Sequence, residues 1–347
     1  MIEFWICFIL SFFGTNYALP HSIRKLKESN YLARDMYKKV KIFIPTNAGI
    51  IVLFTSFLAI SITPLFSRLF LRIIDLDIVS TDFSIESISL LLVVSIFSIY
   101  GLVDDLVDIG RIPKFVLPLF FSYPLIAVVS PNELWIPFSG HFDLNQNFGW
   151  WITYNDLFRV FVIPIYIMVV ANLVNMHSGY NGLQSGLSII LLLTITVKTY
   201  LDGNFSLIFP IGAFLGGMIA FWRFNRFPAR VFEGNIGSLL FGSLIGCVIV
   251  IQEYWWFGFF ILLPHTFNFI LWIYWLVMMR ADPSNYLETT GLHQKFGSIR
   301  GDGTLNVPNY LTLKWMPNYF FSLNEYQSVL TMYSITLMFC FLGLIIY

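Results

Sequence analysis

The feature that most constrains this 347-residue chain is its series of long apolar stretches. A helix of about 20 apolar residues crosses the hydrocarbon core of a bilayer with its backbone polar groups bonded internally. Ten stretches approach that length, near residues 4–19, 47–67, 86–103, 115–130, 155–174, 186–200, 205–222, 236–253, 254–279 and 325–347. Only 12% of the residues are charged, against about a quarter in soluble domains. The sequence therefore predicts an all-α polytopic membrane protein with about ten transmembrane helices, forming one domain over residues 1–347.

The placement of Lys and Arg predicts the orientation of the chain, because cytoplasmic connections are enriched in basic residues. Alternate connections hold 16 of the 20 basic residues; they lie near 20–46, 104–114, 175–185, 223–235 and 280–324. The long connection 131–153 holds none. We therefore expect these five connections on the cytoplasmic face and both termini outside. Stretch 4–19 has no basic segment before it, which favours a retained span over a signal peptide.

Three carboxylates follow directly on the third apolar stretch, in SIYGLVDDLVDIGRIPK. Asp104 and Asp108 are one helical turn apart, and Asp105 lies beside them. Acids at the C-terminal end of a helix oppose its dipole, so a divalent cation or a basic partner would offset their repulsion. A solvated acidic turn is the simpler alternative. The three cysteines, Cys7, Cys247 and Cys340, lie inside apolar runs and are expected to be buried thiols.

A second polar motif, NLVNMHSGYNGLQSG, ends the fifth stretch. Asn172 and Asn175 are one turn apart, so their amide oxygens could face a common site. Gly179, Gly182 and Gly186 would permit close approach of backbone to a phosphate or a base. An ordinary interhelical turn needs one glycine rather than three, and His177 alone is more often structural than metal-binding.

Two further motifs lie in the remaining basic connections. EGNIGS, which begins at Glu233 and opens a helix, could present free N–H groups to an anion or oxygen ligands to a hard metal. In GLHQKFGSIRGDGTL, three side chains could serve as donors within eight residues: His293, Lys295 and Arg300. Asp302-Gly303 is a hairpin turn signal, so a small hairpin is expected before the last helix.

Taken in order, these motifs resemble the polyprenyl-phosphate N-acetylhexosamine-1-phosphate transferases, and most closely their eukaryotic and archaeal UDP-GlcNAc:dolichyl-phosphate GlcNAc-1-phosphotransferase branch. The resemblance covers nearly the whole chain. It rests on the G-x-x-D-D stretch, the N-x-x-N-x-x-x-G-x-N-G-L loop, the P-x-R-V-F-x-G junction and Phe267-Asn268-Phe269. It implies ten spans and transfer of GlcNAc-1-phosphate from UDP-GlcNAc to dolichyl phosphate, which releases UMP and starts N-glycan precursor assembly.

The resemblance also implies roles for individual residues. Asp104 and Asp105 match the aspartate pair that positions or activates the lipid phosphate, and Lys114 matches a lysine that contacts the nucleotide diphosphate. Magnesium, with manganese as an alternative, would be bound by Asn175, Asn235 and Asp105. The substrate-binding set is Lys38, Asn172, Gly179, Asn181, His293, Lys295 and Arg300.

The chain departs from the family pattern at two places. Asn235 stands where the family has a magnesium-binding aspartate, and an amide oxygen is a poorer magnesium ligand than a carboxylate. Either Asn235 coordinates in neutral form, or Glu233 or Asp105 supplies the charge, or activity is reduced. The family's Arg-His-Arg cluster reads Leu292-His293-Gln294-Lys295 here, so Lys295 or Arg300 would have to supply its positive charge.

Two alternative functions stay open. One is a bacterial-type transferase that uses undecaprenyl phosphate with UDP-GlcNAc or UDP-MurNAc-pentapeptide. The other is a multi-span transporter, which predicts ionisable residues at mid-depth of the spans, where only His265 is found. The expected partners are UDP-GlcNAc, the lipid phosphate and membrane lipids, with no nucleic acid and with a homodimer left open. An archaeal cell membrane is favoured over the endoplasmic reticulum.

Overall fold

The computed structural model describes residues 2–73, 84–107, 109–286 and 296–347. Its helices are α1 (Ile2–Glu28), α2 (Gly49–Ile73), α3 (Ile85–Val107), α4 (Arg111–Phe121), α5 (Tyr154–Leu157), α6 (Ile163–Met176), α7 (Leu183–Leu201), α8 (Ile208–Asn225), α9 (Gly234–Ile251), α10 (Trp255–Ile261), α11 (Leu263–Ala281), α12 (Pro283–Tyr286), α13 (Met316–Phe320) and α14 (Glu325–Ile346), with the short segments η1 (Tyr123–Ala127) and η2 (Phe158–Val162). Three antiparallel ribbons pair β1 (Leu32–Asp35) with β2 (Ile42–Pro45), β3 (Glu133–Ile136) with β4 (Gly140–Asp143), and β5 (Ser298–Ile299) with β6 (Leu305–Asn306).

The prediction of an all-α polytopic membrane protein is confirmed. Within the described residues, eight helices are long and apolar enough to span a membrane, and the pair α10 and α11 forms a ninth candidate with a 61° bend. The stretch near 115–130 folds as α4 and η1, whose apolar part, Val116–Ala127, is shorter than a usual span. The predicted hairpin before the last helix is the β5–β6 ribbon, with Gly303 at a φ of 89° in its turn.

The helices extend further than the apolar stretches predicted. α1 continues to Glu28, and the expected connection 104–114 is mostly helical because α3 ends at Val107 and α4 begins at Arg111. The connection 175–185 shrinks in the same way, since α7 begins at Leu183. Hydropathy reports where apolar side chains end, whereas the backbone hydrogen bonds of a helix continue through polar residues. Lys114 therefore lies on a helix rather than in a loop.

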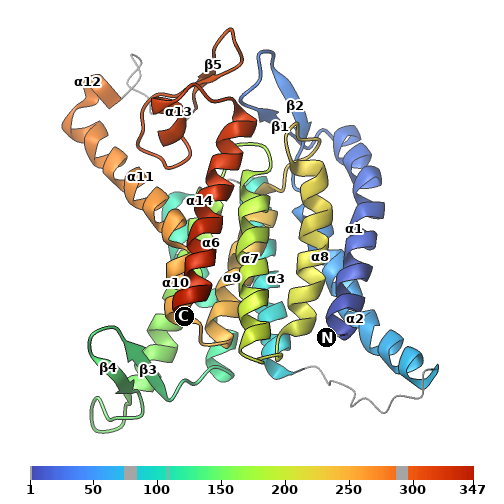
Figure 1. Cartoon of the computed structure of the whole chain (residues 1–347), viewed down its shortest axis with the longest axis vertical. Helices are drawn as coiled ribbons and strands as arrows, with labels where there is room; N and C mark the ends of the chain where they lie inside the picture. Colours follow the sequence, from blue (N-terminus) through green and yellow to red (C-terminus); the bar gives the residue numbers. More distant parts are fainter. Residues whose placement is uncertain (1, 74–83, 108, 287–295) are drawn as a thin grey trace.

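The motifs gather at one end of the bundle. Figure 1 shows ribbons β1–β2 and β5–β6 together with α12 and α13 at the upper end. Both chain termini and ribbon β3–β4 lie toward the lower end (Figure 1). We call these the motif end and the distal end. The described parts of the five predicted cytoplasmic connections open onto the motif end, because the helices alternate in direction. All three cysteines are buried free thiols, as expected.

Helix α9 is the central element of the bundle, and small residues let its neighbours approach closely. α9 packs against α2, α3, α6 and α7. A Cβ on Gly242 would lie 2.7 Å from Cα of Ala171 in α6, and a Cβ on Gly246 would lie 3.4 Å from Cα of Ile167. Close backbone approach through glycine is typical of helix packing in membranes. The α6–α9 contact therefore depends on these two glycines.

A methyl group at Gly242 tests this contact. Gly242→Ala should lower the free energy of unfolding by about 1–3 kcal/mol, because the added Cβ must push α6 away from α9. Thermal unfolding in detergent measures the effect. Gly149→Ala is the matched control, since nothing lies within 4 Å of a Cβ built there. Equal melting temperatures for the two variants would contradict the close packing.

Candidate active site

The Asp104 side chain joins two sequence motifs at the end of α3. Its Oδ1 forms an ion pair with Nζ of Lys114 at 2.9 Å, and its Oδ2 accepts a hydrogen bond from Nδ2 of Asn235 at 2.9 Å. The Asp104 side chain is 8% exposed and that of Lys114 is 37% exposed. The carboxylate is thus largely enclosed while the ammonium group stays accessible. Three residues that the sequence assigned to catalysis or metal binding are in direct contact.

The second carboxylate, Asp105, faces the beginning of α9. Its Oδ2 accepts a hydrogen bond from the backbone N–H of Asn235 at 2.7 Å. Gly234 has a φ of 71°, and a Cβ there would lie 2.9 Å from Oδ2 of Asp105, so a side chain would disturb both the turn and the contact. The positive end of the α9 dipole lies against acids that the dipole of α3 disfavours. This arrangement explains how Asp104 and Asp105 can follow an apolar stretch.

Asn175 lies at the same end of the bundle, close to the beginning of α9. α6 and α9 run antiparallel with Ala171 beside Gly242, which puts Asn175 level with Ser238. Gln184 confirms this alignment, because its Nε2 donates to the Val174 carbonyl at 3.2 Å and its Oε1 accepts from Oγ of Ser238 at 2.9 Å. Ser238 is three residues, or about 4.5 Å along the axis, from Asn235.

The donor atoms at this end of the bundle fit a hard divalent cation. They are the carboxylates of Asp104 and Asp105 and the side-chain amide oxygens of Asn175 and Asn235. Magnesium prefers oxygen ligands and is usually held by one or two carboxylates together with substrate phosphates. Among the described residues no group of three or more His, Cys, Asp or Glu is gathered for a metal. The arrangement therefore suits an ion shared with a phosphorylated substrate better than a closed protein site.

Glu233 lies next to this cluster, but its carboxylate bonds to Asn225 instead of to the cluster. Its Oε2 accepts a hydrogen bond from Nδ2 of Asn225 at 2.9 Å, and Oδ1 of Asn225 accepts from Oγ of Ser185 at 2.6 Å. Burial raises the pKa of Glu233 to about 7. Of the two acids that could replace the missing charge at Asn235, Asp105 is therefore the one in contact with it.

A second polar cluster holds the substrate-binding candidates Lys38 and Asn181. Nζ of Lys38 contacts Oδ1 of Asp35 at 3.0 Å and Oε2 of Glu325 at 2.6 Å. Oε1 of Glu325 accepts from the backbone N–H of Asn181 at 2.7 Å, and Nδ2 of Asn181 donates to Asp35 at 3.2 Å. Asp35 and Glu325 are each 3% exposed. We name these four residues the clamp, because they join β1, the α6–α7 loop and α14.

The clamp uses most of the hydrogen-bonding capacity of its members. The side-chain oxygen of Asn181 also accepts from the backbone N–H of Ala229 at 2.9 Å. Nζ of Lys38 lies 5.0 Å from the ring centroid of Phe227. Lys38 and Asn181 therefore have a structural role that the sequence did not indicate.

Gly179 packs against a lysine from the last connection. Nζ of Lys314 donates to the Ser178 carbonyl at 2.6 Å and would lie 2.5 Å from a Cβ on Gly179. Burial lowers the pKa of Lys314 to about 8. Burial, followed by nearby His265 and Lys314, holds the pKa of His177 well below its usual value. This packing explains why the loop needs glycine at position 179.

The side chains of two other candidates, Asn172 and Arg300, bond to groups outside the Asp104 cluster. Nδ2 of Asn172 donates to the Met168 carbonyl of its own helix at 2.8 Å. Arg300 bonds within the β5–β6 ribbon, to the Leu305 carbonyl at 3.0 Å and to Oδ1 of Asn306 at 3.2 Å. Asp108, His293 and Lys295 lie outside the described residues.

Sequence reasoning missed Glu325, Lys314 and Asn225. Glu325 resembles an ordinary acid in the first turn of a helix, and Asn324 indeed caps α14 in a capping box. The available signal was weak: each is a polar residue bordering a long apolar stretch. Only the fold reveals the partners that are distant in sequence, which lie 40 positions away for Asn225, 136 for Lys314 and 287 for Glu325.

Replacing Lys38 by an uncharged residue tests the structural role of the clamp. Lys38→Met leaves Asp35 and Glu325 buried without a cation, so we expect a loss of about 3–5 kcal/mol in the free energy of unfolding. Thermal unfolding in detergent measures it, with the exposed Lys41→Met as the matched control. An unchanged melting temperature with lost substrate binding would instead assign Lys38 to the substrate.

Comparison with known proteins shows which class of enzyme this chain resembles. The Glycosyl transferase family 4 profile matches residues 87–253, a range that holds Asp104, Asp105, Lys114, Asn175 and Asn235. A Sulfolobus acidocaldarius protein, provisionally named a UDP-N-acetylglucosamine–dolichyl-phosphate N-acetylglucosaminephosphotransferase, is 29% identical over 97% of this chain and 94% of its own. A Saccharolobus solfataricus protein with the same provisional name is 29% identical over 97% of this chain and 95% of its own.

The similarity also extends to bacterial enzymes. The phospho-N-acetylmuramoyl-pentapeptide-transferase of Streptococcus equi subsp. equi is 28% identical over 71% of this chain and 72% of its own. The profile match and these relatives share one class of chemistry. These matches identify the chain as a membrane glycosyl-1-phosphate transferase that resembles the polyprenyl-phosphate N-acetylhexosamine-1-phosphate transferase superfamily, and its similarity to the GlcNAc-1-phosphotransferase branch extends over nearly its whole length.

Proposed function

We propose that this protein transfers GlcNAc-1-phosphate from UDP-GlcNAc to a polyprenyl phosphate of the dolichyl type. The observation that carries the proposal is the contact of Asp104 with both Lys114 and Asn235. One carboxylate thereby joins three helices, α3, α4 and α9, at the motif end of the bundle. The two archaeal relatives named for this reaction, which align over 97% of the chain, support the same substrates.

In the proposed reaction an oxygen of the lipid phosphate attacks the β-phosphorus of UDP-GlcNAc. The bond from that phosphorus to the bridging oxygen breaks, and UMP leaves with the electron pair. Both reactants are anionic, so the protein mainly positions them and neutralises charge. The acceptor is anchored in the bilayer, which requires a site at the end of the membrane-spanning bundle. No nucleophilic side chain is needed for this step.

The residues of the site divide this work. Lys114 has a 37% exposed side chain, so its ammonium can contact a diphosphate while Asp104 fixes its direction. Asp105 orients the first turn of α9 through the backbone of Asn235. A magnesium ion bound to these carboxylates and to Asn175 and Asn235 would supply positive charge to the phosphate oxygens. The protein's own contribution is to hold the oxygen donors and Lys114 on three packed helices.

A bacterial-type activity on undecaprenyl phosphate is the second candidate, favoured by the Streptococcus equi match. That alignment covers 71% of the chain, whereas the two archaeal alignments cover 97%. UMP release measured across a panel of sugar nucleotides and lipid phosphates would separate the two. We also propose that the motif end faces the cytoplasm, because the basic residues gather there. An archaeal cell membrane remains our preferred location, and a homodimer remains open.

Removing either partner of the Asp104–Lys114 pair tests the proposal. Purified protein with magnesium, dolichyl phosphate and UDP-GlcNAc should release UMP, and Asp104→Asn or Lys114→Ala should lower the rate at least about 100-fold, since each removes charge from the reacting groups. Lys27→Ala, an exposed lysine at the motif end, is the matched control. Undiminished turnover in both variants would refute these roles even if the substrates were right.

Restoring a carboxylate at position 235 tests the metal assignment. In Asn235→Asp, the new carboxylate lies against Asp104 in place of a hydrogen-bond donor, so repulsion should lower the melting temperature without magnesium. Magnesium should reverse that loss and should activate at lower concentration than in the unchanged protein. Gln146→Glu adds the same charge at an exposed position. A magnesium response identical in both variants would argue against metal contact at Asn235.

A further inference from the structure

The distal end of the bundle carries a cavity of about 380 Å³. It lies between ribbon β3–β4, the end of α7 and the connection between α9 and α10. α7 and α9 begin at the motif end, so this cavity lies at the far ends of two helices that form the candidate active site. Its lining includes six aromatic residues, Trp135, Tyr254, Trp255, Trp256, Phe257 and Tyr347, and three acids, Glu133, Asp202 and Glu253.

One half of the cavity already holds an ammonium group of the chain itself. Nζ of Lys198 contacts both carboxylate oxygens of Asp202 at 2.9 Å. The same Nζ lies 5.4 Å from the ring centroid of Tyr254 and 6.0 Å from that of Phe257. A carboxylate beside an aromatic face is a favourable environment for an ammonium ion. This half is therefore filled.

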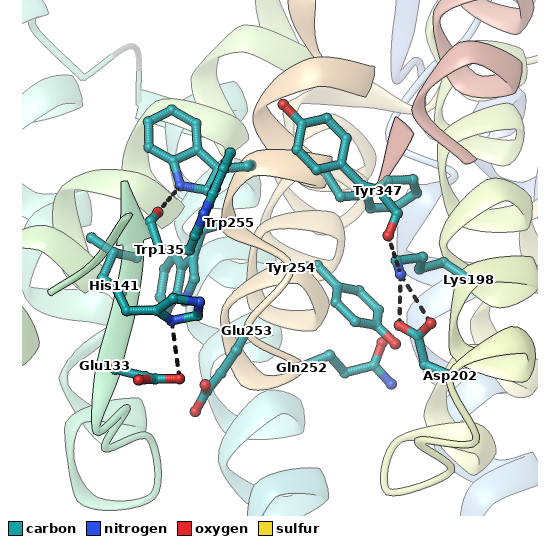
Figure 2. A pocket seen from close by; sticks show the side chains of 13 residues that line it. Glu133, Trp135, His141, Lys198, Asp202, Gln252, Glu253, Tyr254, Trp255 and Tyr347 are labelled. Atoms are coloured by element: carbon teal, nitrogen blue, oxygen red, sulfur yellow. Dashed lines mark hydrogen bonds and ion pairs between the residues drawn. The ribbon is translucent and has the colours of Figure 1, made fainter. Parts of the chain in front are cut away.

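The other half has the same chemistry without a cation. The side chain of Glu253 is exposed and makes no hydrogen bond or ion pair within the described residues, and Figure 2 shows its carboxylate between the Glu133–His141 pair and Tyr254. Nδ1 of His141 lies 3.2 Å from Oε1 of Glu133, so that imidazole is already used. Partial burial raises the pKa of Glu253, as expected for a carboxylate that lacks a compensating charge.

Aromatic walls complete this half. Trp135 and Trp256 meet edge to face with ring centroids 6.5 Å apart, and the indole N–H of Trp256 donates to the Trp135 carbonyl. Trp255 also lines the cavity; its ring packs edge to face on Phe158 and Tyr166, and its indole nitrogen is buried without a hydrogen-bond partner among the described residues. The ribbon is thus tied to α10, which keeps the cavity walls in place.

We propose that this half of the cavity binds a small organic ammonium ion, with Glu253 as its counter-ion and Trp135 and Trp255 as its aromatic walls. The net charge of the lining supports a cation, because three acids face one lysine, and that lysine is already paired. Tryptophans at a membrane boundary are common, but an aromatic belt needs neither a cavity nor an unpaired carboxylate. The ligand can reach the site as a soluble amine or as a lipid headgroup.

Choline binding to the full-length protein in maltoside micelles tests this proposal by equilibrium dialysis. Its neutral isostere, 3,3-dimethylbutan-1-ol, has the same shape without the charge. Choline should bind saturably, and the isostere should compete about tenfold more weakly, because it lacks the positive charge that the aromatic rings and Glu253 attract. No saturable choline binding up to about 100 mM, or equal competition by the isostere, would overturn the proposal.

Paired substitutions at Glu253 separate charge from folding. Glu253 has a φ of 59°, a conformation that Asp and Asn both tolerate. Glu253→Asp should keep choline binding, and Glu253→Asn should weaken it about tenfold, although the two side chains have the same size. Equal binding by the two variants would contradict a role for the charge. Glu86→Gln, at the distal end of α3, is the control outside the cavity.

Two further measurements identify the source of the ammonium and its independence from catalysis. In nanodiscs, phosphatidylcholine should compete with free choline if a headgroup fills the site, whereas phosphatidylglycerol should not; equal choline binding in both assigns the site to a soluble amine. UMP release by Glu253→Asn should stay within about twofold of the unchanged protein, because the cavity lies at the opposite end of α9.

Discussion

The structure depends on how the negative charges of two adjacent carboxylates are compensated at the end of a membrane-spanning helix. Asp104 and Asp105 lie where the dipole of α3 and the edge of the bilayer both disfavour negative charge. The beginning of α9 supplies a backbone N–H to Asp105 and a side-chain amide to Asp104, and Lys114 supplies a full positive charge. This compensation is partial, because two carboxylates face one ammonium. The remaining negative charge is what the proposed magnesium ion would neutralise.

The clamp compensates buried negative charge at the same end of the bundle. Lys38 neutralises two buried acids that come from opposite ends of the sequence, Asp35 and Glu325. Asn181 bonds to both acids, which ties the glycine-rich loop to the rest of the bundle. Lys314 holds the same loop from its other side through the Ser178 carbonyl. The glycine-rich loop is thereby fixed on two sides by buried polar contacts.

The same helices carry different chemistry at their two ends. α9 begins with Asn235 in the candidate active site and ends beside Glu253 in the distal cavity. Between these ends its buried residues are apolar or small, so charge is confined to the two surfaces. This separation argues against a transport path along the described part of the bundle. His265 is buried there and packs edge to face on His177 near the motif end.

The sequence by itself determined the membrane class, the helical architecture and the gathering of the polar motifs at one end. These follow from local quantities: the length of an apolar stretch, the alternation of connections, and the order of short motifs. It also placed Asp104, Lys114 and Asn235 in one site through their resemblance to a family. Only the tertiary structure decided which atoms meet. The pairing of Lys38 with Glu325, across 287 positions, depends on the direction of side chains in the folded bundle. No local pattern encodes such a contact, because its energy arises only when burial removes both groups from water.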